Sequence, residues 1–371
     1  MGNAFGLKRK LTHLLPSFPR DFSGFFHSFK WIYLLLPVCL LLNGCGNLLY
    51  LSRLGWHQSF IIFRSVPVQE LLEDEHLEDE IREKIQLIQR VKRYGEERLG
   101  LKRTGSYTAY FELDRPVLHM LTASEKDRLR LYHWNFPVIG KVTYKSFFTL
   151  KEAMEEKRTL ERHGFDTYLQ QAAAYSTLGW LKDPIFSTML QWDDPTLVNL
   201  LLHEMAHATV YFKGETDLNE QLATFIGNKG AILFLTETYG AGSKEVALAI
   251  DYQEDDLTFA KWIEEAYQHL SEFYAQPLSR EEKLKGREQI FEGLQKKLRE
   301  MRGQFRTGCY RDFESKRLNN AVLLAHRRYL QRLDRFEALY ERLGKDLKKV
   351  VEFLKEINTS GDKRILTSFL E

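Results

Sequence analysis

The segment His203-Glu204-Met205-Ala206-His207 pairs two metal-binding side chains with one carboxylate in the pattern H-E-x-x-H. Residues four apart lie on the same face of a helix, so both imidazoles can bind one metal ion. Glu204 lies about 100° round the helix from His203, where its carboxylate can act on a metal-bound water. The pattern predicts a Zn²⁺ site with Glu204 as general base.

A catalytic zinc needs a third protein ligand and leaves one position open for water. Downstream of His207, a turn at Gly214 precedes the segment Asn219-Glu220-Gln221-Leu222-Ala223. A second helix would then return antiparallel with Glu220 near its start, so Glu220 is the preferred third ligand. Glu215 and Asp217 are rival ligands, but both fall in the expected turn.

The flanks of the motif, residues 197–202 and 208–212, are mostly apolar and predict a buried helix. Two histidines and a glutamate are costly to bury without a partner, and bound zinc supplies one. The alternative is a pair of hydrogen-bonded core histidines with a salt-bridged glutamate.

The elements that must position these residues can be read from periodicity and turn residues. Asp194-Pro195 predicts the start of the motif helix, which would run from Thr196 to about Phe212, with the second helix following from about Leu218. Before the motif we expect a helix over 66–99 that ends near Gly95, followed by a hairpin of strands 106–113 and 117–123. Strand and turn are expected over 134–144, and a helix capped by Gly164 over 149–162. After the motif we expect long charged helices from Lys244 onward.

These elements predict an α+β fold that is mostly helical. A small N-terminal β-hairpin or sheet region would pack on a zincin-like helical domain, followed by long C-terminal helices. The expected divisions are a signal peptide over 1–44, a lipid-anchored helical region over 45–100, a metallopeptidase core with both motif helices over 101–240, and a C-terminal helical region over 241–371.

The N-terminus has the pattern of a secretory signal. Trp31–Ser52 contains no charged residue and follows several Lys and Arg residues. The segment Leu42-Asn43-Gly44-Cys45 resembles a bacterial lipobox, which predicts cleavage before Cys45 and lipidation of its thiol. An uncleaved transmembrane anchor or a buried helix are the alternatives. Because Gly46 replaces the Asp that commonly retains lipoproteins in the inner membrane, we expect a cell-envelope protein in the outer membrane, facing the periplasm.

Composition narrows the class of partner. A net charge of +2 over 371 residues lacks the basic excess of a nucleic-acid binder. Cys39 would leave with the signal and Cys45 would be lipidated, so Cys309 alone cannot build a disulfide framework or a cysteine zinc site. The expected partners are a peptide or protein substrate and, through the lipid anchor, a membrane.

The chain resembles the gluzincin metallopeptidases, whose third zinc ligand is the glutamate of an N-E-x-x-A motif on the following helix. It also resembles an aminopeptidase family of bacterial lipoproteins, most clearly between about 170 and 230. The segments that carry the second resemblance are Ala174–Ile185, His203–His207, Asn219-Glu220, Gly44-Cys45 with Tyr50, Ser106-Tyr107, Trp134–Pro137 and Asn319–Ala321. The resemblance implies a zinc aminopeptidase with ligands His203, His207 and Glu220.

Such enzymes use a Tyr or His to stabilise the oxyanion, and Tyr175 is our candidate, with aromatic packing under the site as the alternative. Thermolysin-like gluzincins place an Asp where this chain has Thr224, so Asp217 or Asp183 would have to orient the imidazoles. The substrate-amine motif G-x-M-E-N of related aminopeptidases has only a partial counterpart at 152–156, in an expected helix.

Two further functions stay open. The protein could be a zinc endopeptidase, or a non-catalytic envelope lipoprotein with a structural metal site. Glu204 favours catalysis, because a structural site needs no general base.

Overall fold

The computed structural model describes residues 45–113, 118–136, 140–172, 177, 179, 181–361 and 364. Contacts divide the chain into two compact units, one ending at Val66 and the other running from Pro67 to Glu371. The predicted signal segment 1–44 lies outside the described residues.

Helix α2 (Cys45–Arg64) belongs to the first unit and contains no acidic residue. Its Trp56 and Phe63 side chains are strongly exposed. Among the helices that the structure describes, none combines the length and apolar character needed to cross a bilayer. The two-residue strand β1 (Val66–Pro67) lies at the boundary between the units.

The helix expected over 66–99 is in fact two helices, α3 (Val68–Glu73) and α4 (Asp79–Glu97). The chain becomes extended at Asp74, where the guanidinium of Arg82 donates a hydrogen bond to the Asp74 carbonyl at 2.6 Å. That side chain satisfies a carbonyl which a continuous helix would have used internally. The predicted apolar stripe of α4 is confirmed as buried: Ile81, Ile85, Ile88 and Val91.

The main sheet is antiparallel, with β3 (Leu118–Glu125) between β6 (Tyr144–Phe147) and β7 (Phe165–Ala172). The predicted hairpin of 106–113 with 117–123 is wrong. Strand β2 (Ala109–Phe111) pairs instead in parallel with β8 (Ile185–Phe186), far along the chain. The linking Asp-Arg-Pro lacks the Asn-Gly type of pair that a tight hairpin turn requires, and β2 instead pairs with a fully buried apolar strand.

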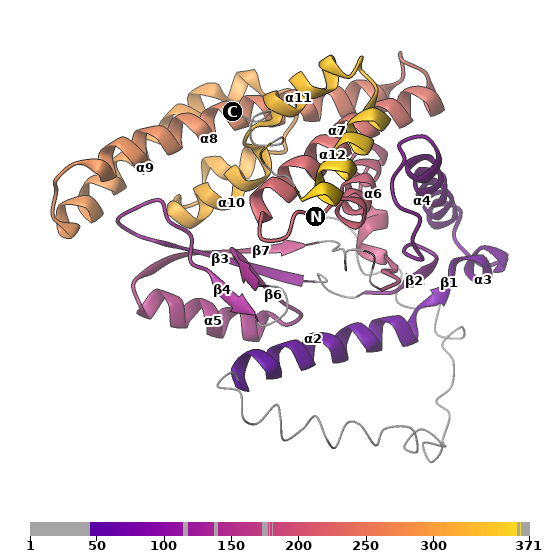
Figure 1. Ribbon diagram of the computed structural model, residues 1–371, viewed down its shortest axis with the longest axis horizontal. Coiled ribbons are helices and arrows are strands. Elements are labelled where there is room, and N and C mark those ends of the chain that lie inside the picture. The colour runs from indigo at the N-terminus through magenta and orange to yellow at the C-terminus, as the bar shows by residue number, and fades with distance from the viewer. Residues whose placement is uncertain are drawn as a thin grey trace. The chain divides into compact units, whose positions relative to one another are not determined.

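The predicted strand and turn over 134–144 are confirmed as the hairpin β4 (Trp134–Phe136) and β5 (Gly140–Val142). Helix α5 (Leu150–Arg162) is also confirmed; the hydroxyl of Thr149 caps its start, and Gly164 follows its end with φ +84°. Figure 1 shows α5 on one face of the main sheet and α10 on the other. Strand β3 is therefore buried along almost its whole length.

The remaining chain is helical, and the predicted α+β, mostly helical fold is confirmed. The helices are α6 (Asp194–Thr209), α7 (Thr216–Tyr239), α8 (Lys244–Ala275), α9 (Arg280–Glu300), α10 (Asn320–Leu330), α11 (Leu333–Arg342) and α12 (Leu347–Ser360), with the 3-10 turns η3 (Ser187–Gln191), η4 (Met301–Gln304) and η5 (Arg311–Glu314). The long charged helices expected after Lys244 correspond to α8 and the elements that follow it.

A buried ion pair fixes the start of α10. The guanidinium of Arg287 on α9 donates two hydrogen bonds to the carboxylate of Asp166 on β7, at 2.7 and 2.9 Å. The same carboxylate accepts a hydrogen bond from the backbone N–H of Asn320 at 3.1 Å. The Asn320 side chain donates in turn to the carbonyl of Glu125 at the end of β3, at 2.9 Å. Helix α10 is therefore tied to the sheet and to α9 at its first residue.

Candidate metal centre

Helix α6 carries both motif histidines, and its sequence explains where it starts. The carboxylate of Asp193 accepts a hydrogen bond from the Thr196 N–H at 2.8 Å, and Pro195 occupies the first turn. The cap is one residue earlier than predicted. The helix ends at Thr209, three residues before Phe212, because the chain turns extended at Val210. One face of α6 is fully buried, and the two histidines are partly exposed at its end.

The turn between α6 and α7 positions the third candidate ligand, Glu220. Gly214 adopts φ +81°, a conformation that residues with a side chain rarely adopt. The buried side chain of Asn219 accepts a hydrogen bond from the Phe212 N–H and donates one to the Phe212 carbonyl. The adjacent residue, Glu220, is buried in the first turns of α7 and points back toward α6.

Glycines on α7 let the two helices approach closely. A Cβ placed on Gly227 would lie 3.0 Å from the Asn199 carbonyl oxygen and 3.3 Å from the Cβ of His203. A Cβ on Gly230 would lie 2.7 Å from a methyl group of Leu202. The absence of side chains at these positions therefore sets the separation between the helix that carries the histidines and the helix that carries Glu220.

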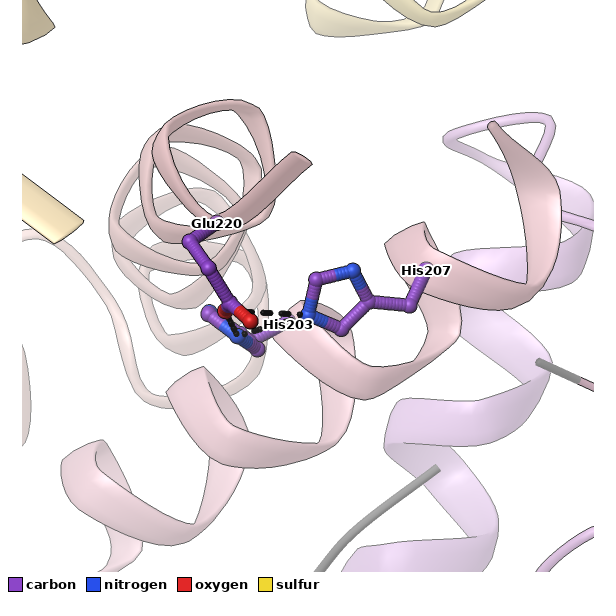
Figure 2. Close-up of side chains that lie close together, drawn as sticks. All are labelled: His203, His207 and Glu220. Carbon is purple, nitrogen blue, oxygen red and sulfur yellow. Dashed lines mark hydrogen bonds and ion pairs between the residues drawn. The ribbon is translucent and has the colours of Figure 1, made fainter. Parts of the chain in front are cut away.

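The three predicted ligands meet in space, as Figure 2 shows. The Nε2 atoms of His203 and His207 are 3.1 Å apart, and Oε2 of Glu220 lies 3.4 and 3.3 Å from them. A tetrahedral zinc with bonds of about 2.0–2.1 Å needs its donor atoms about 3.3–3.4 Å apart. The donor set therefore fits zinc in both chemistry and spacing.

The two carboxylates expected to orient the imidazoles, Asp217 and Asp183, have other partners. Oδ1 of Asp217 lies 3.3 Å from Nε of Arg328, and Oδ2 of Asp183 accepts hydrogen bonds from the N–H and hydroxyl of Thr177 at 2.9 and 3.1 Å. In the described residues neither carboxylate hydrogen-bonds an imidazole, and the buried Nδ1 of His207 has no partner. The expectation that Asp217 or Asp183 orients the histidines is therefore wrong.

The three candidate ligands and Glu204 are strongly coupled electrostatically. Burial alone would raise the pKa of Glu220, but the adjacent imidazoles of His207 and His203 outweigh it and hold the pKa of that carboxyl well below its usual range. Burial raises the pKa of Glu204, and the two imidazoles oppose that rise. Burial lowers the pKa of His207, but Glu220 more than compensates and the net shift is upward. The site therefore concentrates negative charge that a cation would balance.

Three residues near the ligands were not anticipated from the sequence. The Tyr144 hydroxyl on β6 donates a hydrogen bond to Oε1 of Glu220 at 3.5 Å. The ring of Tyr329 on α10 lies 6.3 Å from the His203 ring, centroid to centroid. Arg328 is fully buried, with its guanidinium carbon 5.1 Å from the Tyr144 ring centroid. The sequence feature that pointed to this region was Asn319–Ala321, which lies at the start of α10.

Tyr175, the expected oxyanion donor, lies outside the described residues.

Comparison with known proteins gives one match. The family described as "Putative aminopeptidase" matches residues 49–365. Neither the curated proteins nor the solved structures contain a significant match. The family match runs from α2 through both motif helices to the end of α12. The chain therefore belongs to this aminopeptidase family, whose description points to peptidase activity.

Proposed function

We propose that the protein is a zinc-dependent peptidase of the aminopeptidase type. In this proposal His203, His207 and Glu220 bind Zn²⁺ and Glu204 is the general base. The observation that carries it is the spacing of three donor atoms, 3.1 to 3.4 Å apart, together with the partly buried carboxylate of Glu204 on the helix that carries both histidines.

Zn²⁺ bound at this site would polarise the substrate carbonyl and acidify a water. Glu204 accepts the proton of the attacking water and passes it to the leaving nitrogen. The raised pKa of this partly buried carboxylate suits a group that takes up a proton and releases it again. The Tyr144 hydroxyl holds the second oxygen of Glu220, so Oε2 faces the imidazoles.

A non-catalytic protein with a structural metal is the second candidate. Structural zinc sites are usually closed by four protein ligands, whereas catalytic sites keep one position open. Within the described residues the cluster has three members, which favours the catalytic alternative.

A matched pair of substitutions tests the roles. Glu204→Gln removes a proton acceptor but no zinc ligand, so zinc content and thermal stability should stay near wild type while peptide hydrolysis falls by roughly a hundredfold or more. Glu220→Gln weakens the metal itself, so zinc content and hydrolysis should fall together. The opposite pattern would invert the two roles. If neither change affects metal content or hydrolysis, the residues form a buried polar cluster and the proposal fails.

The choice between exopeptidase and endopeptidase is tested with one peptide in two forms. An aminopeptidase should cleave the peptide with a free N-terminus and leave the N-acetylated form intact. Equal cleavage of both forms would identify an endopeptidase.

We further propose that Cys45 is lipidated and holds the protein at the outer membrane, facing the periplasm. Cys45→Ser should block processing and mislocalise the protein, whereas Cys309→Ser should leave both unchanged. If Cys45→Ser stays in membranes at precursor length and the wild type is also uncleaved, the N-terminal segment is a transmembrane anchor instead.

A further inference from the structure

Helix α2 exposes three aromatic side chains on one of its sides. The exposed fractions are 75% for Trp56, 45% for Phe60 and 80% for Phe63. At 100° per residue these positions fall within an arc of about 60°, and we call them the aromatic face. Gln58 and Ile61, on the other side of the helix, are buried. A helix that only packed against protein would place its aromatic rings on the buried side.

Positive charge accompanies the aromatic face. Arg53 precedes the face by one turn and Arg64 directly follows it, and both side chains are exposed. The guanidinium carbon of Arg64 lies 4.7 Å from the centroid of the Phe60 ring. Helix α2 contains no acidic residue, and the first one after it is Glu70. Exposed aromatic rings beside arginines are typical of helices that lie in the interface of an anionic bilayer.

A second copy of the chain is a poorer occupant of this face. Three aromatic side chains with these exposed fractions offer roughly 300–500 Å² of surface. A stable protein interface buries about 800 Å² on each partner. Pairing two copies through this face would also bring their arginines together, where like charges repel. A surface of anionic headgroups satisfies both the rings and the guanidinium groups.

We propose that the aromatic face of α2 binds the surface of a lipid bilayer that carries anionic headgroups. The helix lies along this surface, with its rings at the boundary between headgroups and acyl chains and its two arginines beside the lipid phosphates. Cys45, the proposed lipidation site, is the first residue of the same helix, so an acyl anchor there would hold the face at the bilayer. The inference does not depend on the peptidase function.

The test is photo-crosslinking of the full-length protein as cells process it, reconstituted into phosphatidylcholine vesicles with or without phosphatidylglycerol. The substitutions Trp56→p-benzoylphenylalanine and Phe63→p-benzoylphenylalanine keep an aromatic ring at each position. Leu54→p-benzoylphenylalanine is the matched control, because Leu54 lies about 160° round the same helix from Trp56. Lipid adducts should form severalfold more at Trp56 and Phe63 than at Leu54. Their yield should rise with phosphatidylglycerol and fall at high salt.

Combining Arg53→Gln and Arg64→Gln should reduce the adduct yield on anionic vesicles to the level on neutral ones. Equal lipid yields at Trp56 and Leu54 would overturn the proposal. Adducts between two protein chains in place of lipid adducts would identify the face as a protein interface instead. Mass spectrometry of the same sample shows whether Cys45 carries lipid, and the comparison between Trp56 and Leu54 decides the role of the face in either case. A peptide hydrolysis assay on these samples tests the proposed function separately.

Discussion

The side-chain amide of Asn219 hydrogen-bonds to both backbone polar groups of Phe212. Its Oδ1 accepts from the Phe212 N–H at 2.8 Å, and its Nδ2 donates to the Phe212 carbonyl at 2.9 Å. Both residues are buried. Because Asn219 immediately precedes Glu220, this pair of bonds fixes the direction from which the third ligand approaches the histidines. The Asn of the N-E-x-x-A motif is therefore explained by backbone geometry.

Asn219→Ala should cost roughly 2–4 kcal/mol of unfolding free energy, because it leaves a buried N–H and a buried carbonyl without partners. Zinc affinity should fall as well, since Glu220 loses its fixed direction. Denaturant unfolding and a zinc competition titration measure the two effects. Asn358→Ala, at an exposed position of α12, is the control and should change neither. Unchanged zinc affinity in Asn219→Ala would show that the turn does not position Glu220.

Gly227→Ala should weaken zinc binding and destabilise the fold. Its Cβ would lie 3.0 Å from both side-chain and backbone oxygens of Asn199, so α6 and α7 would have to separate. Gly293→Ala on α9 is a matched control with nothing within 4 Å of the new Cβ. There, replacing a helical glycine should stabilise the protein by about 0.5–1 kcal/mol. Thermal unfolding with and without zinc measures the effect of each variant. Equal effects of Gly227→Ala and Gly293→Ala would contradict close packing at Gly227.

Asp166→Ala should destabilise the protein by about 3–5 kcal/mol, because it removes the buried partner of Arg287 and leaves only the exposed Glu288 carboxylate beside the guanidinium. Both side chains are only 6% exposed. Glu265→Ala, which breaks the exposed pair with Lys297, should cost no more than about 1 kcal/mol. Denaturant unfolding compares the two. A small effect of Asp166→Ala would mean that solvent reaches the Arg287 guanidinium.

Unfolding free energy should depend on pH through His326. Burial lowers the pKa of His326 to about 4, and nearby Lys316 and Arg328 add to that. The unfolded chain therefore binds more protons below pH 6.5, so this contribution to stability is complete above pH 6.5 and is lost as pH falls toward 4. His326→Phe should reduce the loss over that window by on the order of 3 kcal/mol. Parallel pH curves for variant and wild type would contradict a neutral, buried His326.

Much of the candidate site follows from local sequence rules. The four-residue spacing of His203 and His207 fixes their common face, and a glycine turn followed by Asn219-Glu220 gives the third ligand. The start of α6 was predicted to within one residue from Asp and Pro preferences. Each of these depends on residues close together in the chain.

What could not be predicted depends on packing between distant segments. The pairing of β2 with β8 joins strands separated by the whole main sheet, and nothing in residues 106–117 encodes the partner. Tyr329 and Arg328 reach the centre only because Asn320 is tied to Asp166 and the end of β3. The break between α3 and α4 similarly depends on the hydrogen bond from the Arg82 side chain to the Asp74 carbonyl.

The late position of α10 in the sequence also orders the events of biosynthesis. A nascent chain that ends soon after α7 already contains His203, His207 and Glu220, but lacks Arg287 and all of α10. Domains begin to fold from the N-terminal side during synthesis, whereas contacts between distant segments form only after both have emerged. All three candidate metal ligands are therefore synthesised before Tyr329 and Arg328. The packing of Arg328 against Tyr144, beside Glu220, can therefore form only after the chain has been extended through α10.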